Sequence, residues 1–178
     1  IFNKLILGFD YLDEVDFSDI YSIVNVIEDL LEKKGDNKLS EYRFYEEVLR
    51  VFNKVDKNLD FIQIINKYSI QEKLIICHLI CRYIDGSTGD RANDFAESLF
   101  DNLSRRARFL ESVLKLELDI FKDKLVQLEE RSGFFDSSAD IELTPKAISL
   151  LLRSKDKTKK QEFKAHFTKH IKFNSLKK

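Results

Sequence analysis

The stretch GFFDSSADIELTPKAISLLL, residues 133–152, decides the fold class. Two short apolar segments, Phe134-Phe135 and 141–143, flank a turn of small and acidic residues, which is the pattern of a β-hairpin. A helix follows at once. Thr144 can cap its start, and the proline after it suits the first helical position, where a missing N–H costs no hydrogen bond. The stretch therefore predicts a β-hairpin followed directly by a short helix.

The rest of the chain has the pattern of helices, because apolar residues recur at a spacing of three and four. Segment 69–86 is apolar nearly all round, which predicts a buried central helix. Ser69 and Glu72 form a capping-box pattern at its start. The predicted helices before the hairpin are 18–35, 40–54, 57–67, 69–86, 90–103 and 104–133, the last with a break near Glu117.

The order helix 69–84, helix 91–102, helix 119–132, hairpin and helix is that of a winged helix, with the hairpin as the wing. We predict an all-α fold with a small β-hairpin wing, built as a helical bundle plus a winged-helix-like unit. Composition agrees, since 43% of the 178 residues are hydrophobic and 34% are charged, with one proline and five glycines. So few turn residues argue against an all-β sandwich, and this hydrophobic content argues against a disordered chain.

Charge divides the chain unevenly. Residues 1–152 carry a net charge of −9, whereas residues 153–178 carry +8 and include an expected amphipathic helix at 162–171. Because the chain begins at Ile1 and contains no methionine, we expect it to be an excised segment of a longer protein. The predicted parts are an N-terminal helical segment at 1–67, a winged-helix-like unit at 68–152, and a basic linker and helix at 153–178 that leads to a missing downstream domain.

The sequence predicts a soluble, cytoplasmic protein. No apolar stretch reaches the roughly 18 residues of a membrane span, and the N-terminus does not resemble a signal peptide. Cys77 and Cys81 lie four apart on a predicted helix, a spacing that rarely suits a disulfide. Free cysteines are typical of a reducing compartment.

Candidate metal sites are poorly supported. The cysteines and histidine of 77–81 lack the second ligand pair that a zinc site needs, so we interpret them as core residues. His166 and His170 lack the glutamate of the zinc-protease motif. The acidic residues of 10–19 lack the glycine and the bidentate glutamate of a calcium loop. We expect no metal in this segment.

No catalytic motif is present. The sequence contains no Gly-x-Ser-x-Gly, and no Gly-Lys pair, so it has no Walker A motif. We therefore predict that this segment is not an enzyme and binds no cofactor.

DNA binding is the alternative function that a winged helix suggests. Such a module inserts the helix before its wing into the major groove. The polar residues of predicted helix 119–132 are slightly acidic overall, the wing carries Asp140 and Glu142 without a base, and the acidic body would be repelled by DNA. DNA binding is thus disfavoured. The candidate contacts, for DNA or for a partner, are Arg105, Arg106, Arg108, Lys122 and Lys124.

Three segments carry a resemblance to a known family: YSIQEKLIICHLI (68–80), RANDFAESLF (91–100) and KLVQLEERSGFFDSSADIELTPKAISLLL (124–152). With the basic stretch IKFNSLKK (171–178), they resemble the region that precedes the ATPase core in certain bacterial AAA-family ATPases. The resemblance implies a non-catalytic N-terminal accessory domain that recognises a substrate or partner, or positions the ATPase core. It implies ATP and Mg²⁺ only for the missing downstream domain, and a homo-oligomer only through the parent protein.

A third interpretation is a helical interaction module of an unrelated family. An exposed apolar patch on the helices of 18–67 would favour it.

Overall fold

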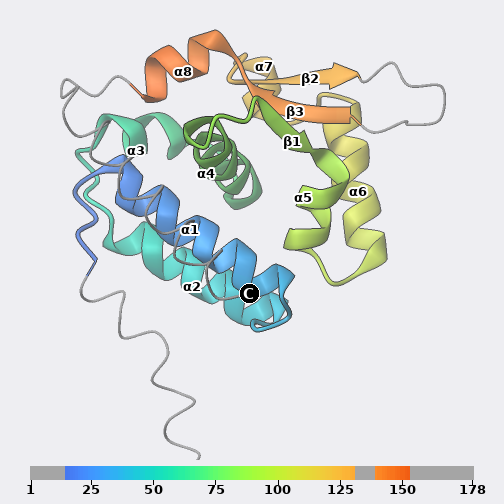
Figure 1. Ribbon diagram of the computed structural model, residues 1–178, viewed down its shortest axis with the longest axis horizontal. Helices are drawn as coiled ribbons and strands as arrows, with labels where there is room; N and C mark the ends of the chain where they lie inside the picture. Colours follow the sequence, from blue (N-terminus) through green and yellow to red (C-terminus); the bar gives the residue numbers. More distant parts are fainter. Residues whose placement is uncertain (1–14, 131–138, 153–178) are drawn as a thin grey trace, which may run out of the picture.

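The computed structural model of the chain describes residues 15–130 and 139–152 (Figure 1). This part is mostly helical with a small three-stranded antiparallel sheet, which confirms the predicted fold class. The elements are α1 (Ile20–Gly35), α2 (Glu41–Lys54), α3 (Asp60–Ile65), α4 (Ile70–Ile84), β1 (Gly89–Arg91), α5 (Ala92–Leu99), α6 (Leu103–Leu114), α7 (Asp119–Lys122), β2 (Val126–Glu130), β3 (Ala139–Leu143) and α8 (Pro145–Leu151).

Short polar side chains start most of the longer helices by accepting hydrogen bonds from free backbone N–H groups. The predicted capping box of α4 is confirmed, since Ser69 and Glu72 satisfy each other's backbone N–H groups. Glu72 is buried and also accepts from the N–H of Ile120 at 3.1 Å, so the same carboxylate fixes the start of α7. The capping residues are Asp19, Ser40, Ser69, Asn102 and Thr144.

The strands pair in the order β1-β3-β2, all antiparallel. Strand β2 runs from Val126, opposite Leu143, to Glu130, opposite Ala139. The prediction of a helix over 119–132 is therefore wrong. Val126 and Leu128 alternate with polar residues, as a strand facing a core on one side requires, although their neighbours are good helix formers. The predicted first strand, Phe134-Phe135, lies outside the described residues.

Strand β1 was not predicted, because three residues are too few to show a period. It forms by pairing with β3, where Gly89 lies opposite Glu142 and Arg91 lies opposite Asp140. A Cβ at Gly89 would lie 2.5 Å from the carbonyl oxygen of Ile141, so only glycine permits this close approach of the two strands. The pairing of β1 with β3 thus requires glycine at position 89.

From α4 onward the elements follow in the order α4, β1, α5, α6, α7, β2, β3 and α8, and we call the paired strands β2 and β3 the wing. Helices α5 and α6 form a helix-turn-helix joined by residues 100–102. The long predicted helix 104–133 does break near Glu117, but it continues as the four-residue α7 and then β2. The long helix that precedes the wing is therefore α6, drawn in yellow on the right of Figure 1, and not residues 119–132.

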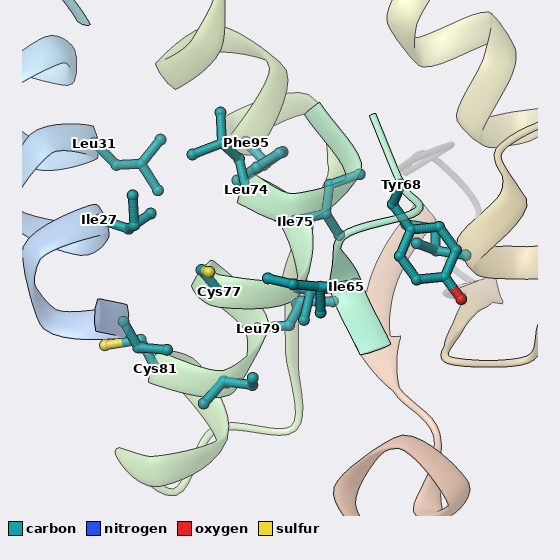
Figure 2. Packing of buried hydrophobic residues seen from close by; sticks show 14 of the residues in the cluster. Ile27, Leu31, Ile65, Tyr68, Leu74, Ile75, Cys77, Leu79, Cys81 and Phe95 are labelled. Carbon is teal, nitrogen blue, oxygen red and sulfur yellow. The ribbon is translucent and has the colours of Figure 1, made fainter. Parts of the chain in front are cut away.

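Helix α4 is the centre of the core, as its all-round apolar pattern predicted, and every residue from Leu74 to Cys81 is buried. Figure 2 shows Cys77 and Cys81 on the side of α4 that faces α1, close to Ile27. Buried residues of α1, α2 and α3 belong to the same cluster as those of α4, α5 and the sheet. The core is thus continuous across residue 67, and the boundary placed there stays a prediction.

Several predictions concern residues outside 15–130 and 139–152. They concern residues 136–138 of the predicted turn, the basic linker and helix of 153–178 with His166 and His170, and the acidic residues at 10–14. In the described part, no helix is both long and apolar enough to cross a bilayer.

Candidate interaction surface on helix α6

Helix α6 brings together three of the five predicted contact residues. Arg105, Arg106 and Arg108 lie within its first two turns. Lys122 ends α7, where its Nζ lies 2.7 Å from Oδ1 of Asp119. Lys124 follows in a left-handed conformation (φ 56°) that leads into β2. The two lysines therefore belong to the α7–β2 turn and not to the helix-turn-helix.

Two of the three arginines are bound by carboxylates of the domain itself. Arg105 forms an ion pair with Glu41 at the start of α2, and its guanidinium lies 4.9 Å from the ring centroid of Phe100. Arg106 lies 3.0 Å from Oε1 of Glu97, and its Nε donates a hydrogen bond of 2.6 Å to the carbonyl of Phe100. These contacts hold the start of α6 against α2 and α5.

The turn between α5 and α6 is anchored to the α1–α2 hairpin as well. Lys34, only 3% exposed, forms an ion pair with Asp101, whose N–H donates to Oε2 of Glu41 at 2.9 Å. The hydrogen bond from Lys34 holds the pKa of the Asp101 carboxyl below its usual value. Because Lys34 of α1 and Glu41 of α2 both bind Asp101 in this turn, the N-terminal helices fix the orientation of α6.

The exposed face of α6 carries apolar side chains that sequence reasoning missed. Leu103 is 77% exposed and Leu114 is 55% exposed, although leucine is among the residues most often buried. Together with Ala107 and Leu110 they follow a 4-3-4 spacing, which places all four on one side of a helix. We call Leu103, Ala107, Leu110 and Leu114 the leucine stripe. The spacing was visible in the sequence, but only the structure shows that Leu103, Ala107 and Leu114 are exposed, whereas Leu110 is half-buried against the core.

Exposed leucines also gather at the end of α6. Leu116 is 47% exposed and adopts a left-handed conformation (φ 55°), which is unfavourable for a residue with a Cβ. Elsewhere in the described chain, the exposed large apolar residues are Tyr42 and Leu49 of α2 and Leu150 of α8. Half of the six are thus on α6 or directly after it.

The wing is acidic and carries no base in the described strands. Residues 126–130 and 139–143 read VQLEE and ADIEL. Gln127 is exposed and donates a hydrogen bond to Glu142 of the neighbouring strand. A wing of this charge repels a phosphate backbone.

A second polar cluster lies inside the molecule, around His78. Its Nδ1 lies 2.9 Å from Oε2 of Glu28 on α1, and its Nε2 lies 2.6 Å from Oδ2 of Asp90 on β1. Burial disfavours the charged imidazole, but the hydrogen bonds to Asp90 and Glu28 and their negative charges outweigh it and raise the pKa of His78 to about 9. The imidazole is therefore protonated at neutral pH and donates to both carboxylates.

The two cysteines beside this histidine are buried and free. Burial raises the pKa of both thiols above the ordinary value, which suppresses the reactive thiolate. Within the described ranges, no three histidine, cysteine, aspartate or glutamate side chains are placed to hold a metal ion.

Comparison of the chain with protein-family models, with curated proteins and with solved structures gives no match.

Proposed function

We propose that this chain is a non-catalytic, protein-binding winged-helix domain that docks its partner on the exposed face of α6. The observation that carries the proposal is the leucine stripe, because an apolar row with Leu103, Ala107 and Leu114 exposed, on a helix held in place by ion pairs, is typical of a protein contact site. Two supporting features make DNA a poor fit. The nearest arginines, Arg105 and Arg106, are already paired with carboxylates, and the wing is acidic.

We further propose that the domain is the N-terminal accessory part of an AAA-family ATPase in the cytoplasm. The support is the resemblance over 68–178. In this proposal a domain beyond Lys178 binds ATP and Mg²⁺ and assembles the oligomer. The domain described here recognises a substrate or partner for that machine, or positions the ATPase core.

The first experiment is to read the coding sequence beyond Lys178. A G-x-x-x-x-G-K-[ST] motif after a strand pattern, within about one domain length, supports the ATPase proposal. A stop codon directly after Lys178 contradicts it, while the protein-binding proposal for α6 stands or falls by its own test.

DNA binding is the second candidate, and one observation favours it. Arg105, Arg106 and Arg108 lie on α6, the helix that a winged helix inserts into the major groove, and not at a remote position. The test is fluorescence anisotropy of a labelled duplex at increasing salt. Protein docking predicts no saturable binding even at low salt. Binding that falls steeply with salt and weakens on Arg108→Ala would favour DNA instead.

A further inference from the structure

The leucine stripe is a second apolar face on a helix that already has one. Phe109 and Val113 point into the core, whereas Leu103, Ala107 and Leu114 are exposed and Leu110 is half-buried at the border. At 1.5 Å per residue, the stripe is about 17 Å long, or three helical turns. Leu110 also packs against the core from this border, so the stripe residues left exposed in the described part of the chain are Leu103, Ala107 and Leu114. The stripe has the length and spacing that match one face of another helix.

Positive charge lies along one side of the stripe. Arg108 lies four residues after Ser104, and Lys115 lies seven residues after Arg108, so the three form a row on the exposed face next to the leucines. Lys115 pairs with Glu111 at 2.5 Å, with both side chains more than half exposed. Arg108 is exposed and forms no ion pair with any described residue. A cation with no acidic partner among the described residues therefore lies beside a row of largely exposed apolar side chains.

We propose that the leucine stripe binds an amphipathic helix of a protein partner that carries leucine-like residues at the same spacing and aspartate or glutamate beside them. This inference rests on the proposed protein-binding function and specifies the chemistry of the partner. An acidic flank on the incoming helix pairs with Arg108 and competes with Glu111 for Lys115, while its apolar face covers Leu103 and Leu114.

The positive charge of α6 also argues against a second copy of the chain as the partner that covers the leucine stripe through its own α6. Helix α6 contains three arginines and one glutamate, and Lys115 follows directly after it. Two such helices packed face to face bring basic side chains together, which costs binding energy. The partner surface that complements this charge is acidic, whereas the α6 helix of another copy is basic.

The test uses two synthetic helical peptides with the same leucine row, one flanked by glutamate and the other by lysine. Each is titrated into the ¹⁵N-labelled chain and followed by amide chemical shifts. We expect the glutamate peptide to shift the amides of 103–116 in a saturable manner, and the lysine peptide to bind at least about tenfold more weakly. Leu103→Glu and Leu114→Glu, both at exposed positions, should abolish the shifts. Leu49→Glu, on α2, is the matched control and should leave them unchanged.

Charge reversal separates this inference from the broader proposal. The double variant Arg108→Glu, Lys115→Glu should reverse the preference, so that the lysine peptide binds more tightly. Equal binding of both peptides to the stripe overturns the inference and leaves protein docking intact. Shifts at 103–116 with duplex DNA alone, or none with either peptide, overturn both. Concentration-dependent self-association that Leu114→Glu abolishes shows that a second copy occupies the stripe, which also overturns the acidic partner.

Discussion

The Nε2 atom of His78 lies 2.6 Å from Oδ2 of Asp90, and this short contact joins the central helix to the first strand of the wing sheet. The other ring nitrogen contacts Glu28, so one imidazole links α4, β1 and α1. The ring also packs beside Phe95 of α5, at 5.1 Å between centroids. Helix α1, helix α4 and the sheet therefore share a buried ionic connection as well as a continuous apolar core.

Replacement of His78 by glutamine should remove a pH-dependent part of the stability. The folded protein keeps His78 protonated up to a pKa of about 9, against 6.5 as the ordinary value of the unfolded chain. The stabilisation is thus complete below pH 6.5 and is lost as the pH rises through 9. The shift corresponds to a difference of about 3 kcal/mol. Urea unfolding at several pH values measures it as the gap between wild type and His78→Gln, and a gap that stays constant over this range would refute the prediction.

Gly89→Ala should destabilise the sheet. The new Cβ would lie 2.5 Å from the backbone oxygen of Ile141 and 2.9 Å from Cβ of Glu142, so β1 and β3 must separate. We expect the free energy of unfolding to fall by about 1–3 kcal/mol. Gly35→Ala is the control, because a Cβ there meets no atom within 4 Å and alanine favours a helix. Equal stability of the two variants in urea would show that β1 does not approach β3 so closely.

Replacing Asp101 should destabilise the protein more than replacing Lys34, its buried partner in the ion pair. Asp101→Asn leaves a cation that is 3% exposed without its counter-charge, and we expect a loss of about 1–2 kcal/mol because Asp101 itself is half exposed. Lys34→Met removes the charge as well as the pair and should cost less. Thermal unfolding of both variants checks the order. A larger loss for Lys34→Met would mean that packing of the lysine stem outweighs its charge.

Leu116→Gly should stabilise the protein. Leu116 occupies the left-handed position after α6, where its N–H donates to the carbonyl of Val113 and the next N–H donates to Ser112. Glycine adopts this conformation without steric cost, so we expect a gain of about 1 kcal/mol. Leu116→Ala, which keeps the strain and removes the side chain, should give no gain. Should alanine stabilise as much as glycine, the backbone strain would not be the cause.

The sequence determined the helical class, the capped starts at Ser69 and Thr144, the buried central helix and the break near Glu117. These features are local, because side-chain caps and 3.6-residue periodicity are properties of short segments. A strand at 141–143 followed by a capped helix was also predicted, because both are strong local signals, whereas the predicted helix over 119–132 was wrong.

Only the tertiary structure decided where the wing begins and which helix precedes it. Residues 126–130 have a composition that suits a helix, and pairing with β3 makes them a strand. As a result, the long helix before the wing is α6, which carries Arg105, Arg106 and Arg108. In the ionic cluster, His78 lies 50 residues from Glu28 and 12 residues from Asp90 along the chain, so no sequence periodicity could predict it. Likewise, the 4-3-4 spacing of the leucine stripe is present in the sequence, but spacing alone does not say which apolar face of a helix the fold will bury.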